Sequence, residues 1–73
     1  MSISAYNYKE LREKATAQNA TAGDRLNLFF WFEAYGGSYW NGEFYDMDDG
    51  WRLYPVYEED EDGELELIDA EIR

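Results

Sequence analysis

The sequence predicts an α+β fold in which two N-terminal helices pack on a C-terminal three-stranded antiparallel β-meander. Two capping-box patterns, each followed by apolar residues at helical spacing, occur within residues 1–37. After this segment the pattern changes to short β-prone runs separated by Asn-Gly and Asp-Gly turns. With 73 residues, no internal repeat and no flexible linker, the chain is expected to form one small domain, residues 1–73.

The first helix is predicted over about residues 8–18. Asn7 is expected to cap it, with Glu10 at the third helical position reaching back to the free backbone donors. Glu10 also stands four residues before Lys14, a spacing that favours an ion pair, and Asn19 suits a left-handed stop. The apolar face consists of Tyr8, Leu11 and Ala15.

A second helix is predicted after Thr21, which forms a capping box with Asp24, and it is expected to end at Gly36 and Gly37. Its side chains are apolar on nearly every side: Leu26, Leu28, Phe29, Phe30, Trp31, Phe32 and Tyr35. A small domain needs such a helix for its core, so we expect a sheet on one side of it and the first helix on the other. The alternative is that part of this helix is a contact surface.

Three strands are predicted in the C-terminal part, with a small extra hairpin at Asn41-Gly42. Their runs are residues 43–45, 51–57 and 64–72. Pro55 lacks an amide proton, which places its strand at an edge or next to a bulge. In the last run, the apolar residues before and after Leu67-Ile68 fall on opposite faces, so we expect a bulge there.

Negative charge is concentrated in the C-terminal part of the chain. Residues 43–73 hold thirteen of the seventeen carboxylates against two arginines, so this segment carries the whole net charge of −11, whereas residues 1–42 are neutral. Solubility of a small domain needs a net charge of only about 2–8 in magnitude. A field of one sign repels anionic lipid and nucleic acid and attracts basic partners. We therefore expect neither membrane nor direct nucleic-acid binding.

The residue inventory argues against catalysis. The chain contains no His and no Cys, so its serines have no imidazole base and thiolate or imidazole metal sites are excluded. Glycosidase-like carboxylate pairs need a desolvated carboxyl in a cleft, which a domain this small rarely encloses. We expect no enzymatic activity, no cofactor and no specific metal site. The absence of Cys, of a secretory signal and of a long apolar run favours a cytoplasmic location.

The sequence also contains patterns that are typical of two other ligand classes, calcium and sugars. Residues 58–69 imitate a twelve-residue calcium loop, but Glu58 replaces the usual Asp at its first position, Asp69 is short for its last, and β-prone segments flank it. A solvated acidic turn is the simpler interpretation, although weak binding of divalent cations stays open. The second possibility is a sugar-binding platform of exposed aromatic residues. The alternative is that alternate members of this set pack in the core. The set is Trp40, Tyr45, Trp51 and Tyr54.

The charge density of the acidic segment is comparable with that of duplex DNA. Eleven net charges along a strand of eight residues, ~27 Å long, average about one per 2.5 Å, and duplex DNA carries one per ~1.7 Å of axis. A groove lined with Lys and Arg could therefore accept this surface. The expected contact residues are acids at turns, acids at exposed strand positions and three tyrosines: Asp46, Asp48, Asp49, Glu58, Glu59, Asp60, Glu61 and Asp62; Glu64, Glu66 and Glu71; Tyr45, Tyr54 and Tyr57.

In size, in its acid-rich turns at residues 46–49 and 58–62 and in its lack of a catalytic set, the chain resembles the small acidic proteins that phages and mobile elements use against host defence. Anti-CRISPR and antirestriction proteins are among them. The resemblance implies a stoichiometric inhibitor that mimics nucleic acid and occupies the channel of a basic nucleic-acid-binding protein.

The main alternative is a protein-interaction or accessory domain, in which the acids serve solubility. Its contact surface would be an aromatic patch drawn from Trp31, Phe32, Tyr39 and Trp40. Complexes of a mimic should weaken steeply with salt, whereas an apolar patch should hold its partner at high salt. The oligomeric state is left open.

Overall fold

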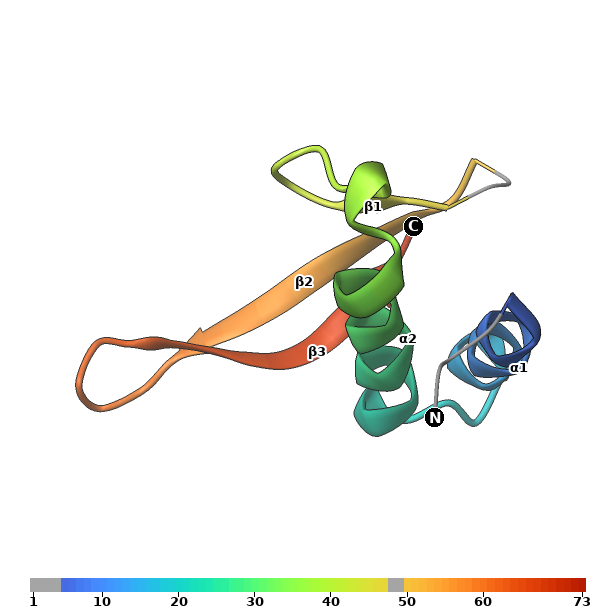
Figure 1. Ribbon diagram of the computed structural model, residues 1–73. Helices are drawn as coiled ribbons and strands as arrows, with labels where there is room; N and C mark the ends of the chain where they lie inside the picture. Colours follow the sequence, from blue (N-terminus) through green and yellow to red (C-terminus); the bar gives the residue numbers. More distant parts are fainter. Residues whose placement is uncertain (1–4, 48–49) are drawn as a thin grey trace.

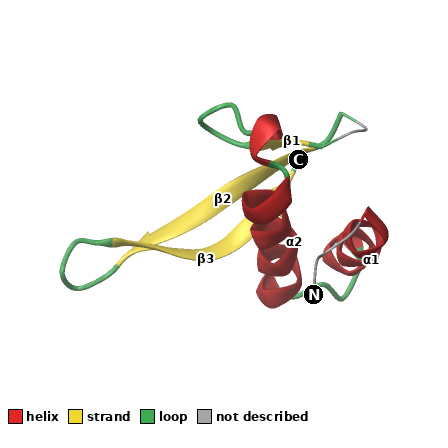
Figure 2. Cartoon of the chain, viewed as in Figure 1, coloured by secondary structure: helices red, strands yellow, loops and turns green. Residues whose placement is uncertain are grey.

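The computed structural model describes residues 5–47 and 50–73, and it confirms the α+β fold. Two helices come first, followed by one turn of 3-10 helix and an antiparallel sheet in the order β1-β2-β3 (Figures 1 and 2). The elements are α1 (Ala5–Thr16), α2 (Ala22–Tyr35), η1 (Gly37–Tyr39), β1 (Tyr45–Asp46), β2 (Arg52–Glu59) and β3 (Leu65–Ile72). Neither helix has the length and apolarity needed to cross a bilayer in the described part of the chain.

Helix α1 is shifted toward the N-terminus relative to the prediction. It begins at Ala5, so Asn7 lies inside the helix and the prediction that it is the N-cap is wrong. An interior Asn costs well under 1 kcal/mol relative to Ala, so a capping residue does not prevent a helix from starting earlier. The helix ends at Thr16, whose hydroxyl donates to the Arg12 carbonyl at 2.8 Å. Asn19 is not a left-handed stop, because no described residue other than glycine has a positive φ.

Helix α2 is capped as the sequence predicts. The Thr21 hydroxyl oxygen accepts from the Asp24 amide at 3.2 Å, and the Asp24 carboxylate accepts from the Thr21 amide at 3.0 Å. At the other end, the Gly36 amide donates to the Phe32 carbonyl at 2.8 Å. A Cβ at Gly36 would lie 2.6 Å from Phe32 Cδ1, so a side chain there would displace a buried ring.

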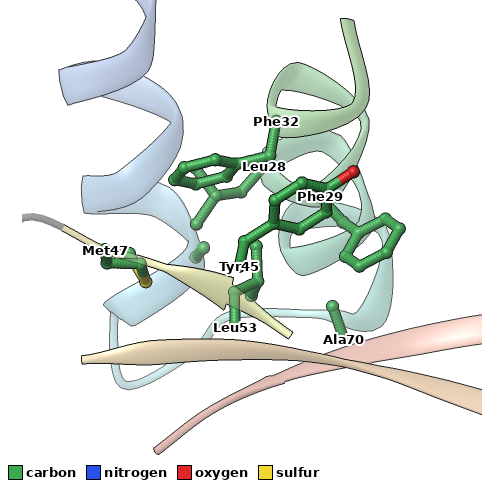
Figure 3. Packing of buried hydrophobic residues seen from close by; sticks show 8 residues of the cluster. Leu28, Phe29, Phe32, Tyr45, Met47, Leu53 and Ala70 are labelled. Atoms are coloured by element: carbon green, nitrogen blue, oxygen red, sulfur yellow. The ribbon is translucent and has the colours of Figure 1, made fainter. Parts of the chain in front are cut away.

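The core lies where α2 meets the sheet, as the sequence predicts, and α1 packs on another side of α2 (Figure 1). Figure 3 shows side chains from α2 interleaved with those of the sheet and its neighbouring loop. The buried cluster comprises Ala15, Leu28, Phe29, Phe32, Tyr45, Met47, Leu53 and Ala70. Tyr8 and Leu11 of α1 pack against it, which confirms the predicted apolar face of the first helix. Phe30 is 49% exposed, so α2 is not covered on every side.

The sheet is a long β2–β3 hairpin with a short third strand at one end. Strand β1 pairs with β2 only at Tyr45↔Leu53 and Asp46↔Arg52, and one further bridge, Trp40↔Tyr45, forms the small hairpin predicted at Asn41-Gly42. Strand β2 is therefore central in order, but beyond Leu53 it has β3 as its one neighbour.

The predicted bulge is present in β3. The register passes from Val56↔Asp69 to Tyr57↔Leu67, which leaves Ile68 as the extra residue. Pro55 stands opposite Ala70, just before this irregularity and in the part of β2 that β1 does not reach. Both predicted features, an open edge at Pro55 and a bulge at Leu67-Ile68, therefore occur together.

Candidate functional site: the acidic arm

The far end of the β2–β3 hairpin extends beyond α2, on the side away from α1 (Figure 1). We call residues 58–66 the acidic arm. All of its carboxylates are exposed, and no basic residue lies between Arg52 and Arg73. The seven acids are Glu58, Glu59, Asp60, Glu61, Asp62, Glu64 and Glu66.

The turn at the end of the arm is held by Asp60. Its Oδ1 accepts from the amides of Asp62 and Glu64, each at 2.9 Å, and its own amide donates to the Glu64 carbonyl at 2.8 Å. Gly63 supplies the positive φ of +81° that closes the turn. Asp60 therefore stabilises the turn. Its neighbours Glu61 and Asp62 lie exposed on this turn.

Two carboxylates of the arm stand directly opposite one another, because Glu58 pairs with Glu66 across the hairpin. Opposite side chains on antiparallel strands lie within ~5 Å, and like charges in such positions are destabilising. The ion pairs between described residues join Lys14 to Glu10, Arg25 to Asp69 and Arg73 to Glu71, and none of them involves an acid of the arm. The hairpin thus keeps a repulsive pair that no cation of the described chain relieves.

The arm reaches a charge density close to that of duplex DNA. From Glu58 to the turn the hairpin rises through about four residues, or ~13 Å at ~3.3 Å per residue. Seven charges over that length average about one per 2 Å, compared with one per ~1.7 Å of duplex axis.

Two of the remaining predicted acids, Asp46 and Glu71, lie away from the arm, so the described acids do not form one continuous face. Asp46 pairs opposite Arg52 at the other end of the sheet, and Glu71 lies 3.3 Å from Arg73 at that same end. Asp48 and Asp49 lie outside the described residues. The acids of the arm and the pair Asp46 and Glu71 therefore lie at opposite ends of the hairpin, and composition alone does not predict this separation.

The three predicted contact tyrosines have different environments. Tyr45 is 6% exposed and packs against Phe29, so the prediction that it offers contact area is wrong. Burial, with the Glu33 charge adding to it, raises the pKa of the Tyr45 hydroxyl. Tyr54 is half-buried under the Arg73 guanidinium, which lies 4.0 Å from its ring centre. Tyr57 is 51% exposed and adjoins the arm.

Arg25 and Asp69 form the ion pair that joins α2 to the base of the hairpin. Arg25 Nε and Nη2 donate to the two Asp69 carboxylate oxygens at 2.8 and 3.0 Å. The hydrogen bond from Arg25 lowers the pKa of Asp69, and burial opposes this shift. Sequence reasoning missed the pair because its partners are 44 residues apart and no local pattern connects them. Asp69 therefore does not add to the free charge of the arm.

The calcium-loop geometry is not formed. Asp69, which would be the last ligand, is held by Arg25, and strands flank the loop. Within residues 5–47 and 50–73, no three carboxylates converge in a way that could hold a metal ion. The sugar platform is also not formed. Tyr45 is buried beneath Trp40. Tyr54 follows Leu53 in strand β2, so its side chain lies on the opposite face of the sheet from the core.

The aromatic patch of the alternative interpretation is divided between covered and exposed residues. Phe32 is buried and Trp31 is half-buried against Tyr8, whereas Tyr39 is exposed, with its ring edge-on to Phe32. Trp40 remains partly exposed while it contacts Tyr45. The four residues do not form a single open surface.

A hollow of about 820 Å³ lies between the helices and the end of the hairpin away from the arm. It is lined by Arg12, Arg25, Trp51, Asp69 and Glu71 among others. Among the described residues that line it, two cations and two carboxylates balance, so these side chains give no net charge with which to select an ionic ligand.

Comparisons with protein-family models, with curated proteins and with solved structures found no match to the chain.

Proposed function

We propose that this protein acts by binding, with the acidic arm occupying the nucleic-acid-binding groove of a basic protein in place of a phosphate backbone. The observation that carries the proposal is the concentration of seven exposed carboxylates on one projecting hairpin. A groove built from Lys and Arg would gain the same attraction from this arm as from a strand of nucleic acid. The resemblance to anti-CRISPR and antirestriction proteins supports a host-defence protein as the target and stoichiometric inhibition as the outcome.

The repulsive Glu58–Glu66 pair gives this proposal a second support. Like charges kept opposite one another lower the stability of the free hairpin, and a basic partner would relieve this repulsion on binding. Tyr57, exposed beside the arm, adds uncharged contact area of the kind that interfaces favour.

The test compares two variants of equal net charge. In the arm variant, Glu58→Gln, Glu61→Gln, Asp62→Asn and Glu66→Gln remove four charges from the arm. The control variant carries Glu13→Gln, Glu33→Gln, Glu43→Gln and Asp46→Asn, all at exposed positions elsewhere. Both changes move the net charge from −11 to −7. Asp60 is left intact in both because it holds the turn.

Each protein is immobilised and used to capture proteins from a bacterial lysate, with elution by heparin. The native chain and the control variant are expected to retain nucleic-acid-binding proteins that heparin releases, and the arm variant is expected to lose them. Equal capture by the arm variant would exclude the arm as the binding element. Capture that survives both heparin and high salt would instead favour an interaction domain with an apolar contact surface.

A further inference from the structure

Within residues 5–47 and 50–73, strand β3 pairs with β2 alone, so its other edge is open. The amides and carbonyls of Arg52 and Arg73 bond to each other at 2.8 and 2.9 Å, which marks this pair as hydrogen-bonded. Bonded and non-bonded pairs alternate along an antiparallel ladder. Counted from the bond between Asp60 and Glu64 at the turn, the Glu59/Leu65 pair is non-bonded.

The next pair along the ladder, Glu58/Glu66, is then hydrogen-bonded, and the pair after it, Tyr57/Leu67, is again non-bonded. The backbone N–H and C=O groups of Leu65 and Leu67 therefore point away from β2, toward the open edge of the arm. Such groups form a template for another strand.

The opposite edge of the hairpin does not offer this template. Beyond Leu53, strand β2 is also without a second neighbour, but Pro55 stands in a non-bonded position opposite Ala70. The N–H that proline lacks would be the one facing outward. Strand addition is therefore blocked at Pro55 and open at β3.

The two faces of the arm differ in chemistry. Leu65 and Leu67 share the face on which Leu53 and Ala70 pack against α2, and Leu65 is 68% exposed. Glu59, opposite Leu65 on β2, is the acid on this face. The other face presents Glu58 and Glu66. A strand added beside β3 would lie ~4.8 Å away, with alternate side chains next to Leu65 and Leu67 on one face and next to Glu66 on the other.

We infer that the open edge of β3 at residues 65–67 binds an extended segment of alternating apolar and basic residues by strand addition. Charge selects this occupant over a second copy, because two arms would bring seven carboxylates against seven others. The preference for basic residues rests on the proposed function, whereas the backbone pairing and the apolar alternation do not. The mode combines main-chain hydrogen bonds for affinity with side-chain alternation for specificity.

The test uses two synthetic peptides of about eight residues with the same composition. One alternates Lys and Val, and the other places all Lys before all Val, so charge and apolar content are matched. The alternating peptide should bind about tenfold tighter, and it should slow amide hydrogen exchange at Leu65 and Leu67.

Two variants separate the backbone from the side chain. Leu65→Pro removes the outward N–H at the first residue of an edge strand, where proline is tolerated, and Leu65→Ala removes only the side chain beyond Cβ. Leu65→Pro should weaken the alternating peptide about tenfold relative to Leu65→Ala. Unchanged amide exchange in the rest of the β2–β3 ladder verifies that both variants keep the hairpin.

The outcomes distinguish this inference from the proposed function. If both peptides bind equally and lose affinity in the arm variant, strand addition is overturned while charge mimicry stands. If the alternating peptide binds with protection of Leu65 and Leu67 while the arm variant captures the same lysate proteins as the native chain, strand addition stands and the mimic fails. A concentration-dependent dimer that Leu65→Pro abolishes would identify a second copy as the occupant and overturn the basic partner.

Discussion

At the scale of single residues, Asp69 decides how the charged hairpin is attached to the helices. Its two hydrogen bonds with Arg25 pair a cation of the N-terminal segment with an acid of the C-terminal segment. Both side chains are less than a third exposed, so water screens this pair less than it screens the exposed pair of Arg73 and Glu71.

Asp69→Asn should lower the free energy of unfolding by about 1 kcal/mol, because the charge-assisted hydrogen bonds of Arg25 lose their anionic acceptor. In a domain of this size that corresponds to a fall of about 4–8 °C in Tm. Glu71→Gln removes one charge from an exposed pair and should change stability by less than about 0.5 kcal/mol. Thermal unfolding of both variants checks the difference, and equal effects would contradict it.

The same pair predicts a pH dependence. Because Arg25 lowers the pKa of Asp69, the folded state binds the Asp69 proton less readily than the unfolded state does. The contribution of Asp69 is therefore complete above the unfolded pKa of about 3.9 and is lost as the pH falls through the lower folded pKa. Urea unfolding of the native chain and Asp69→Asn should differ fully at about pH 6, and the difference should start to shrink below about pH 4 and vanish only below the lowered folded pKa. A difference that persists undiminished at lower pH would exclude this origin.

At the scale of elements, the hairpin carries a local conflict between stability and charge. Glu58→Lys converts the repulsive pair with Glu66 into an attractive one and should raise the free energy of unfolding by a few tenths of a kcal/mol. The same variant should weaken capture of basic proteins. Glu66→Lys serves as the second single variant, and the double reversal should return stability toward the native value in a double-mutant cycle. Additive gains in the double variant would show that the two side chains do not interact.

The turn of the arm makes a different prediction. Asp60→Ala removes the acceptor for the Asp62 and Glu64 amides and should destabilise the hairpin by about 1 kcal/mol. Asp60→Asn keeps the acceptor oxygen and should be close to neutral in stability, although it removes the same charge. Thermal unfolding distinguishes the variants, and an equally destabilised Asp60→Asn would assign the effect to charge instead of to the turn.

The features of these elements that the sequence predicted depend on residues close to one another in the chain. The Thr21–Asp24 capping box, the Gly36 stop and the bulge at Leu67-Ile68 each depend on residues within one turn or one strand, and all are present. The prediction that Asn7 caps the first helix failed because Asn is also tolerated inside a helix, and α1 begins two residues earlier, at Ala5.

The composition of the candidate site was predictable, but its shape was not. Seven of the eleven predicted acids gather on the arm, as their closeness in sequence suggests. The register places Asp46 and Glu71 at the other end of the sheet, and Tyr45 enters the core because it packs between α2 and Trp40. Such long-range pairings follow from tertiary packing, for which no single segment carries the signal.

At the scale of the whole molecule, shape determines which charges a partner experiences. The folded chain measures 39 × 29 × 29 Å, and the arm projects from the body formed by α1, α2 and the core. The Debye length is about 10 Å at 0.1 M salt, so carboxylates at the opposite end of the sheet are largely screened from a groove that holds the arm. The local density of negative charge on the arm, and not the net charge of −11, should therefore control the affinity for a basic partner.

The short screening length predicts how salt acts on the two variants of equal net charge. The control variant should keep the steep loss of affinity for its captured partner between about 50 and 200 mM salt, because all seven carboxylates of the arm remain in place. The arm variant should bind more weakly and show a flatter slope of log affinity against log salt, because fewer charges remain at the contact. Titration of each protein into the purified partner, followed by calorimetry at several salt concentrations, measures both slopes. Equal flattening in the two variants would mean that total charge, spread over the molecule, governs association, and the projecting arm would then have no special electrostatic role.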